Sequence, residues 1–424
     1  MSFNQLSNEL VASVVSFVHD KTSQPTRLSQ KTLASLALTS RRLLPSAQLN
    51  LYYRPIPPSP VTWRTGISLI ESLKSTSCLP SLSSIWSPPG QLVASLEGIV
   101  DFVAEIGTLA EPKGPLPFQL PRHTEAFSLY HGILKACKRL VSVELIFDST
   151  EHLSQLSMAL ESSTSTLKTV TFKNSKFSKL YRLNSGLVCS ALKRDRFKGI
   201  ENLICEEVEV RKSGPAAPPV NIPLKTLVVV LLVTLPPLNW NRRFEKGNSF
   251  FPHDTSSLVS VSIQALKLSQ TDLAWITRSL PTTLKSLTLS TIAVNVLRAP
   301  TRSSFHYQYF PSLLPDDFKR LSNLTHLSLR QFDGPSIALL ESLATSADQL
   351  VSLDFASCKW ISSSSPSQIS TPSTTEIKLA LDRFKKLEKI NLGLIGFGNV
   401  SEWKQLSKEV STNTGIVVLF FAVY

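Results

Sequence analysis

The residue types that usually carry out catalysis or bind metals do not stand at the spacings that such chemistry needs. Of the seven histidines, none lies in an HExxH or HxxxH arrangement, and no cysteine stands at ligand spacing from one. The sequence contains no GxxxxGKS or GxxxxGKT phosphate loop and no GxSxG nucleophile turn. We therefore predict that the chain is not an enzyme, with no catalytic residue, no metal site and no cofactor.

Cysteine usage and apolar runs indicate the compartment. The five cysteines are far apart and include no CxxC pair, so a disulfide framework is not expected. The N-terminus lacks the basic region and continuous apolar stretch of a secretory signal. The longest apolar runs, 227–235 and 416–422, are far shorter than the roughly 20 residues of a membrane-spanning helix. We expect these runs to be buried strands, and the protein to be cytoplasmic and/or nuclear with no membrane partner.

The clearest charge feature is a basic segment at residues 168–198. It holds nine Lys or Arg residues against the single acid Asp195, in a chain of net charge +13. Such a segment can attract an acidic protein, a phosphorylated peptide or nucleic acid through long-range Coulomb forces. A solvated helical face is the alternative interpretation. The candidate target-binding residues are Lys168, Lys173, Lys176, Arg182, Lys193, Arg194 and Lys198.

A six-residue phrase recurs along the chain: an apolar residue, two variable ones, an apolar, a polar and an apolar residue. Position five is polar in all seven clear copies, and this alternation with apolar neighbours indicates a strand with one buried face. The clear copies are LVSVEL at Leu140, LKTVTF at Leu167, LVSVSI at Leu258, LKSLTL at Leu284, LTHLSL at Leu324, LVSLDF at Leu350 and LEKINL at Leu387. Weaker copies begin at Ile200, Leu224 and Ile416.

Helical spacing of apolar residues predicts helices between the phrases, near residues 153–160, 273–280, 337–343 and 377–384. Pro335 marks the expected start of the third helix. Longer intervals carry expected surface loops at 212–223, 236–255, 299–312 and 362–375. A strand followed by a helix that returns to a neighbouring parallel strand resembles the leucine-rich-repeat family, over residues 140–424. The resemblance implies an α/β solenoid, with a curved parallel sheet and outer helices, that binds a protein target.

The N-terminus has a different organisation. Residues 6–18 and 33–44 carry apolar side chains at helical spacing, a third short segment covers 45–53, and a proline-rich stretch follows. The order of these residues over about 4–54 resembles the F-box, a helical module that docks a Skp-type adaptor. A terminal cap of the repeat array is the alternative. By the resemblance, the adaptor-binding or core positions are Leu6, Leu10, Val14, Leu36, Leu38 and Leu44.

Together these patterns predict an F-box-like helical module at 1–55, a linker with degenerate first repeats at 56–139, and a leucine-rich-repeat domain with loop insertions at 140–424. The resemblances imply the substrate-recognition subunit of an SCF-type ubiquitin ligase. Its partners would be a Skp-type adaptor, the cullin ligase complex and an acidic or phosphorylated target protein, and we expect no nucleic-acid partner. The alternative is a leucine-rich-repeat scaffold that binds protein or RNA without a ubiquitin role.

Overall fold

The computed structural model shows an α/β protein in which parallel strands alternate with helices. None of the helices it describes combines the length and the apolar composition that a bilayer crossing requires. The described residues are 13, 15, 32–36, 43–53, 55, 61–75, 89–109, 121–146, 150–173, 185–192, 194–210, 222–234, 257–266, 268, 270–292, 312–332, 334–358, 360, 372–395 and 400–422.

The chain divides into two compact units. The first unit is Met1–Leu183 with Ser190–Ile200, and the second is Asn184–Cys189 with Glu201–Tyr424, so that α9 (Ser185–Leu192) contributes to both. These units come from spatial contacts, and the boundaries at 55 and 139 stay a prediction.

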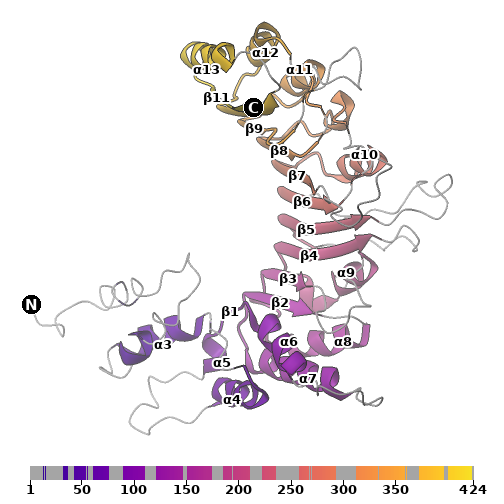
Figure 1. Ribbon diagram of the computed structural model, residues 1–424. Coiled ribbons are helices and arrows are strands. Elements are labelled where there is room, and N and C mark those ends of the chain that lie inside the picture. The colour runs from indigo at the N-terminus through magenta and orange to yellow at the C-terminus, as the bar shows by residue number, and fades with distance from the viewer. Residues whose placement is uncertain are drawn as a thin grey trace, which may run out of the picture. The chain divides into compact units, whose positions relative to one another are not determined.

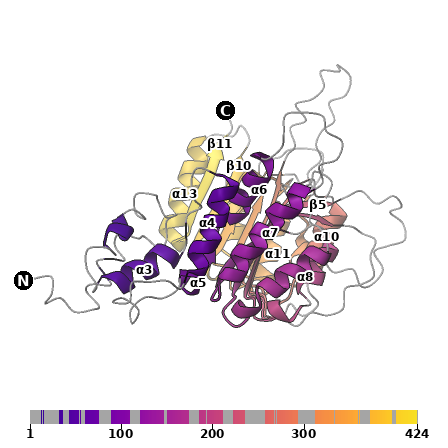
Figure 2. The same ribbon diagram turned by 90° about the horizontal axis from the view of Figure 1, so that it is seen from below.

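The first unit combines helices with three parallel strands that pair in chain order, β1 with β2 and β2 with β3. In Figure 2 the helices α4, α7 and α8 lie side by side. The elements are α3 (Leu44–Tyr53), α4 (Trp63–Lys74), α5 (Pro89–Leu92), β1 (Ser95–Leu96), α6 (Ile99–Leu109), α7 (Pro121–Ala136), β2 (Ser142–Ile146), α8 (Thr150–Ala159), the 3-10 turn Glu161–Ser163, β3 (Thr169–Lys173) and the 3-10 turn Asp195–Phe197.

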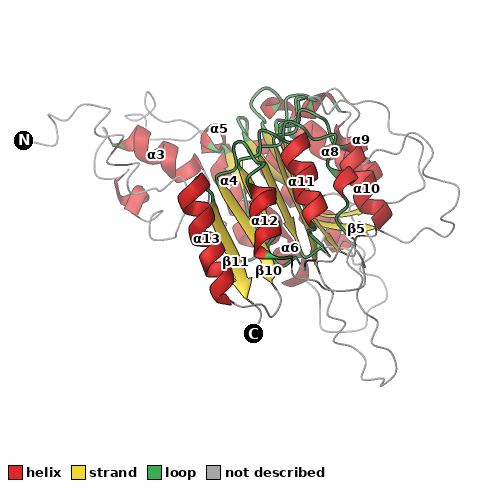
Figure 3. Ribbon diagram, turned by 90° about the horizontal axis from the view of Figure 1, so that it is seen from above, coloured by secondary structure: helices red, strands yellow, loops and turns green. Residues whose placement is uncertain are grey.

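The second unit contains eight parallel strands, each paired with the next one along the chain. Figure 1 shows them stacked in chain order, and Figure 3 shows α11, α12 and α13 side by side over one face. The elements are β4 (Asn202–Val210), β5 (Thr226–Thr234), β6 (Ser260–Leu266), α10 (Gln270–Ser279), β7 (Ser286–Ile292), the 3-10 turn Pro315–Asp317, β8 (His326–Arg330), α11 (Ile337–Ser346), β9 (Ser352–Asp354), α12 (Thr374–Leu381), β10 (Lys389–Ile395), α13 (Val400–Thr414) and β11 (Val417–Ala422).

The ten phrases all lie on strands, β2 to β11, which confirms the strand prediction. Positions one, four and six are buried in the nine copies on β2 to β10; in the copy on β7 they are Leu284, Leu287 and Leu289, each fully buried. Burying a leucine stabilises the folded state by about 1.5–3 kcal/mol. Repetition of the phrase therefore builds one continuous apolar layer under the helices of each unit.

A recurring backbone contact sets the register between neighbouring repeats. The carbonyl oxygen of position two accepts hydrogen bonds from the N–H groups of positions two and three in the next phrase. The Lys285 oxygen, for example, lies 2.8 Å from the nitrogen of Thr325 and 3.0 Å from that of His326. Because β5 to β10 all start from the same contact, side chains at equal phrase positions form rows across these strands.

Three expectations need correction. The last phrase is displaced by one residue, because Val418 pairs with Ile390, so that Val418 is buried and Leu419 is 41% exposed. Pro335 precedes α11, and Ser336 is the N-cap, with its Oγ 3.2 Å from the Leu339 nitrogen. The expected loop at 362–375 overlaps α12, whose N-cap is Ser373.

The segment 56–139, expected as a linker with degenerate repeats, contains the long helices α4, α6 and α7. It also contains β1, a strand whose residues do not complete the six-residue phrase. The register of β1 with β2 aligns Val93 with Leu140, so the copy is VASLEG, with Gly98 in place of the last apolar residue. Four helix predictions correspond to α8, α10, α11 and α12. The loops 236–255 and 299–312 fall almost entirely outside the described residues.

Candidate functional site

The second unit presents a polar strand face on the side of the sheet that α10 to α13 do not cover. Positions three and five of each phrase point to this side because successive side chains in a strand alternate. None of these side chains on β6 to β10 is fully buried. The register of the strands aligns the position-three side chains in one row across the sheet and the position-five side chains in a second row. The strand face consists of Ser260, Ser262, Ser286, Thr288, His326, Ser328, Ser352, Asp354, Lys389 and Asn391.

Asp354 organises the most connected part of the strand face. Its Oδ2 accepts from Ser328 Oγ at 2.9 Å and from Arg330 Nε and Nη2 at 3.1 and 3.0 Å. Its Oδ1 accepts from Asn391 Nδ2 at 2.9 Å and from the Ala356 nitrogen at 3.0 Å. Hydrogen bonds to a charged group are worth about 1.5–3 kcal/mol each in net terms. Three strands are therefore tied together at this carboxylate.

Asn391 is itself held by the backbone of β10. Its Oδ1 accepts from the Gly393 nitrogen at 3.0 Å, which leaves Nδ2 to face Asp354. Gly393 has φ +76° and sits so close to β9 that a Cβ there would lie 2.1 Å from the Phe355 carbonyl oxygen. The glycine is therefore required by both the backbone conformation and the approach of two chain segments.

The strand face carries its positive charge around this carboxylate. Arg330 is the last residue of β8, two residues after Ser328 and on the same side of the sheet, and its side chain is 55% exposed. His326 begins β8 and Lys389 begins β10, and both are exposed. The Nδ1 of His326 lies 2.8 Å from Thr325 Oγ1. Arg330 is the one of these three residues that contacts Asp354, the one carboxylate among the described residues of the strand face on β6 to β10.

The basic segment of the first unit is not presented as one surface. The Nζ of Lys173 lies 3.1 Å from Glu144 Oε1 and 3.4 Å from Asp101 Oδ2, and the Lys173 side chain is only 10% exposed. Glu144 Oε2 accepts from the Gly98 nitrogen at 2.9 Å, and its backbone oxygen accepts from the Tyr130 hydroxyl. Burial raises the pKa of Glu144, and the Lys173 ammonium opposes part of that rise. Lys173 is thus an internal partner and is not placed on an open surface.

The other predicted cations are divided among separate settings. Lys168 is exposed at the turn before β3, and Arg194 is half-buried. Lys198 is exposed, with its Nζ 2.6 Å from Asp195 Oδ1. Lys176, Arg182 and Lys193 lie outside the described residues. Target binding by this segment stays a prediction.

Few of the predicted adaptor-binding positions are described. Leu6, Leu10, Val14 and Leu38 lie outside the described residues. Leu44 is 6% exposed, and Leu36 is partly buried against a small apolar cluster. That cluster consists of Val15, Leu33, Leu43 and Ala47, with Leu51 also packed on it. Sequence reasoning missed Leu49, which is 49% exposed on α3; its position between two buried neighbours, Gln48 and Asn50, gave no apolar periodicity to find.

Within the described ranges, no group of three or more His, Cys, Asp and Glu side chains is arranged to hold a metal ion. Burial raises the pKa of the Cys137 thiol to about 12, so this thiol stays protonated at neutral pH and is a poor nucleophile. No family model matches the sequence, and no curated protein matches it significantly.

Proposed function

We propose that this protein is a non-catalytic substrate receptor of an SCF-type ubiquitin ligase. In this proposal the F-box-like N-terminus docks a Skp-type adaptor, and a leucine-rich-repeat solenoid binds the target protein. The observation that carries the proposal is the two-sided strand repeat of the second unit. On β6 to β10 each phrase buries apolar side chains under the helices and has polar side chains at positions three and five on the opposite face.

The repeat supports a binding role because its polar side is broad and chemically varied. A row of parallel strands adds one pair of outward side chains per repeat, which suits recognition of an extended protein surface. Hydroxyls of Ser260, Ser286 and Thr288 offer donors and acceptors, and the neighbouring strands add charge. Parallel sheets usually have both faces covered. In the described part of the second unit the helices α10 to α13 leave this polar face open, which suits it to a partner.

The docking role rests on the sequence resemblance and on the packing of the N-terminal helices. The apolar cluster around Leu33 and Ala47 lies on residues that the resemblance assigns to the module. Outside this cluster α3 exposes Leu49 and Tyr53, which are 49% and 39% exposed. Exposed apolar side chains on a small helical unit gain stability when a partner covers them.

The mechanism is positional. A receptor that holds a target near a charged ubiquitin-conjugating enzyme raises the effective concentration of target lysines, and no side chain of the receptor needs to react. The two functions need two separate surfaces, one for the adaptor and one for the target.

The docking surface is tested by titrating a purified Skp-type adaptor onto the immobilised full chain. We expect Leu49→Asp to weaken adaptor binding by about tenfold or more, because a buried apolar contact becomes a desolvated charge. The matched control is Met158→Asp on α8, which replaces an exposed apolar side chain of the same unit, 64% exposed, and should not change binding. Absence of adaptor binding by the folded wild-type chain contradicts the proposal.

A further inference from the structure

We infer that the β8–β10 part of the strand face binds an extended acidic segment of the target protein, with Arg330, His326 and Lys389 as its anion-binding residues. This inference rests on the proposed function in one respect, since it takes the strand face as the target-binding surface. It adds the chemistry of the ligand and the residues that recognise it.

Charge is the first observation. The described strand face on β6 to β10 holds one carboxylate, Asp354, whose two oxygens already accept hydrogen bonds from five donors of the protein. Arg330, Lys389 and His326 remain as the groups that a ligand meets. The Lys389 side chain makes no contact with the described residues that would neutralise it. Carboxylates of a partner are therefore attracted here, and cationic partners are repelled.

Arg330 is positioned before any ligand arrives. Its Nε and Nη2 donate to Asp354 and its Nε also approaches Ser328 Oγ at 3.2 Å, which fixes the plane of the guanidinium. Its Nη1 donates to no described residue, and the side chain is 55% exposed. A fixed guanidinium with a free donor binds a carboxylate at little further cost in side-chain entropy. Asp354 thus acts as a positioning residue for Arg330.

Spacing distinguishes an acidic segment from a single phosphate group. His326 and Arg330 stand four residues apart on β8, which is about 13 Å along a strand. Lys389 is aligned with His326 across β9, about 10 Å away. A single phosphoryl group cannot reach all three side chains, whereas an extended peptide with several Asp or Glu residues can. Ser328 and Ser352 lie between these side chains, and their hydroxyls suit the backbone groups of the peptide.

The experiment measures fluorescence anisotropy of labelled probes titrated with the full chain. The probes are a peptide of alternating Glu and Ser, the same peptide with Gln in place of Glu, and a single-stranded RNA of similar length. We expect the Glu peptide to bind, the Gln peptide to bind at least about tenfold more weakly, and salt to weaken the complex. Lys389→Glu and Arg330→Gln should each reduce affinity for the Glu peptide by about fivefold or more.

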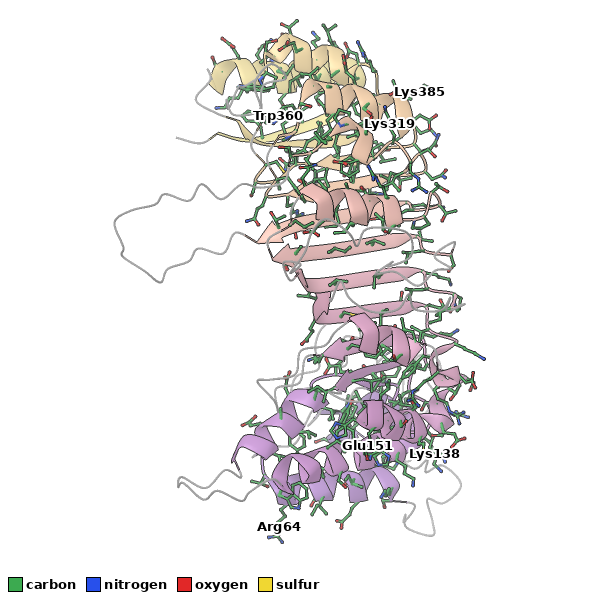
Figure 4. All side chains as sticks on the ribbon, turned by 90° about the vertical axis from the view of Figure 1, so that its right-hand side faces the viewer. Arg64, Lys138, Glu151, Lys319, Trp360 and Lys385 are labelled. Carbon is green, nitrogen blue, oxygen red and sulfur yellow. The ribbon has the colours of Figure 1, made fainter. Side chains whose placement is uncertain are left out.

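The matched control is Lys385→Glu. It makes the same change in net charge four residues before β10, where Lys385 lies on the edge of the second unit near the strand starts (Figure 4), outside the strand face. We expect it to reduce affinity by less than about twofold. An equal effect of Lys385→Glu and Lys389→Glu overturns the inference, because binding would then follow net charge alone. Tighter binding of RNA than of the Glu peptide, lost in Arg330→Gln, also overturns it.

Two outcomes keep this inference separate from the proposed function. Adaptor binding by Lys389→Glu and Arg330→Gln, measured in parallel, should equal that of the wild type. If the wild type binds the Glu peptide through these residues but binds no adaptor, the ubiquitin-ligase proposal fails and this inference stands. If adaptor binds and the Glu peptide does not, this inference fails alone. Lys389→Glu tests the site without touching the Asp354 contacts, so a folding defect in Arg330→Gln does not obscure the result.

Discussion

The guanidinium of Arg330 donates both its Nε and its Nη2 hydrogens to one carboxylate oxygen, Oδ2 of Asp354. The other oxygen is therefore left to Asn391 on the next strand, at 2.9 Å, and to the backbone of Ala356. One side chain thus joins β8, β9 and β10 and orients the cation that we propose meets the target.

Removing this carboxylate should destabilise the second unit. Asp354→Ala leaves the donors of Arg330, Ser328 and Asn391 without their acceptor, and we expect a loss of about 2–3 kcal/mol in the free energy of unfolding. Urea denaturation followed by far-UV circular dichroism measures it. Ser352→Ala, on the same strand and the same face, is the control and should change stability by less than about 0.5 kcal/mol. Equal effects of the two substitutions would show that the network adds no stability.

Gly393 and Gly415 form a matched pair for backbone strain. Both have positive φ, +76° and +75°, but a Cβ at Gly393 would lie 2.1 Å from the Phe355 oxygen, whereas a Cβ at Gly415 would have nothing within 4 Å. We expect Gly415→Ala to cost about 1 kcal/mol, from the left-handed conformation alone. Gly393→Ala should cost about 3 kcal/mol or more, because two strands must also separate. Melting temperatures of the two variants that agree within error would contradict the close approach.

The contact between Lys173 and Glu144 predicts that the stability cost of replacing Lys173 depends on pH. Burial holds the pKa of Glu144 above its usual value, and Lys173 opposes that rise, so Lys173→Met should raise this pKa further. A raised pKa in the folded state means that this group favours folding most at low pH, below its unfolded pKa of about 4.3, and less as pH rises through the folded value. The substitution should therefore cost about 3 kcal/mol near neutral pH and clearly less near pH 5, where Glu144 can accept a proton.

Urea denaturation of the wild type and Lys173→Met at both pH values measures this difference. Lys138→Met, an exposed lysine of the same unit, is the control and should have a small effect at either pH. A cost for Lys173→Met that is the same at both pH values would mean that the ammonium does not control the ionisation of Glu144.

The register of the last strand gives a fourth prediction. Val418 is 5% exposed and Leu419 is 41% exposed. Val418→Asp should therefore cost about 3 kcal/mol or more, since it buries a carboxylate without a partner, while Leu419→Asp should cost less than about 1 kcal/mol. Thermal unfolding of the pair decides the register. If Leu419→Asp proves less stable than Val418→Asp, Leu419 is the buried residue and the phrase starts at Ile416.

The strands were predictable because a buried layer demands the same apolar spacing in every repeat, and ten phrases gave their positions. Two details escaped this pattern. In the copy on β1, Gly98 stands in place of the last apolar residue, and the strand is only two residues long, so the apolar spacing does not identify it. In β11 both Val418 and Leu419 are apolar, and only pairing with Ile390 decides which of them is buried.

The polar sites were not predictable in the same way, since their partners come from distant parts of the chain. Arg330 and Asn391 reach Asp354 from 24 and 37 residues away. Lys173 looked like a surface cation within its basic segment, but Asp101, 72 residues earlier, and Glu144 enclose it. A charge run shows which residues are ionised, and only the tertiary fold shows which of them are already paired.

Hydrogen–deuterium exchange of the full chain, with and without a Skp-type adaptor, measures whether the docking part and the target-binding part are separate. We expect adaptor to slow exchange in the N-terminal helices, including residues 32–53, and to leave the amides of β4 to β11 unchanged, because the strand face is kept for the target. Slower exchange across β6 to β10, or no change anywhere with adaptor in excess, would contradict the division of the chain into a docking part and a target-binding part.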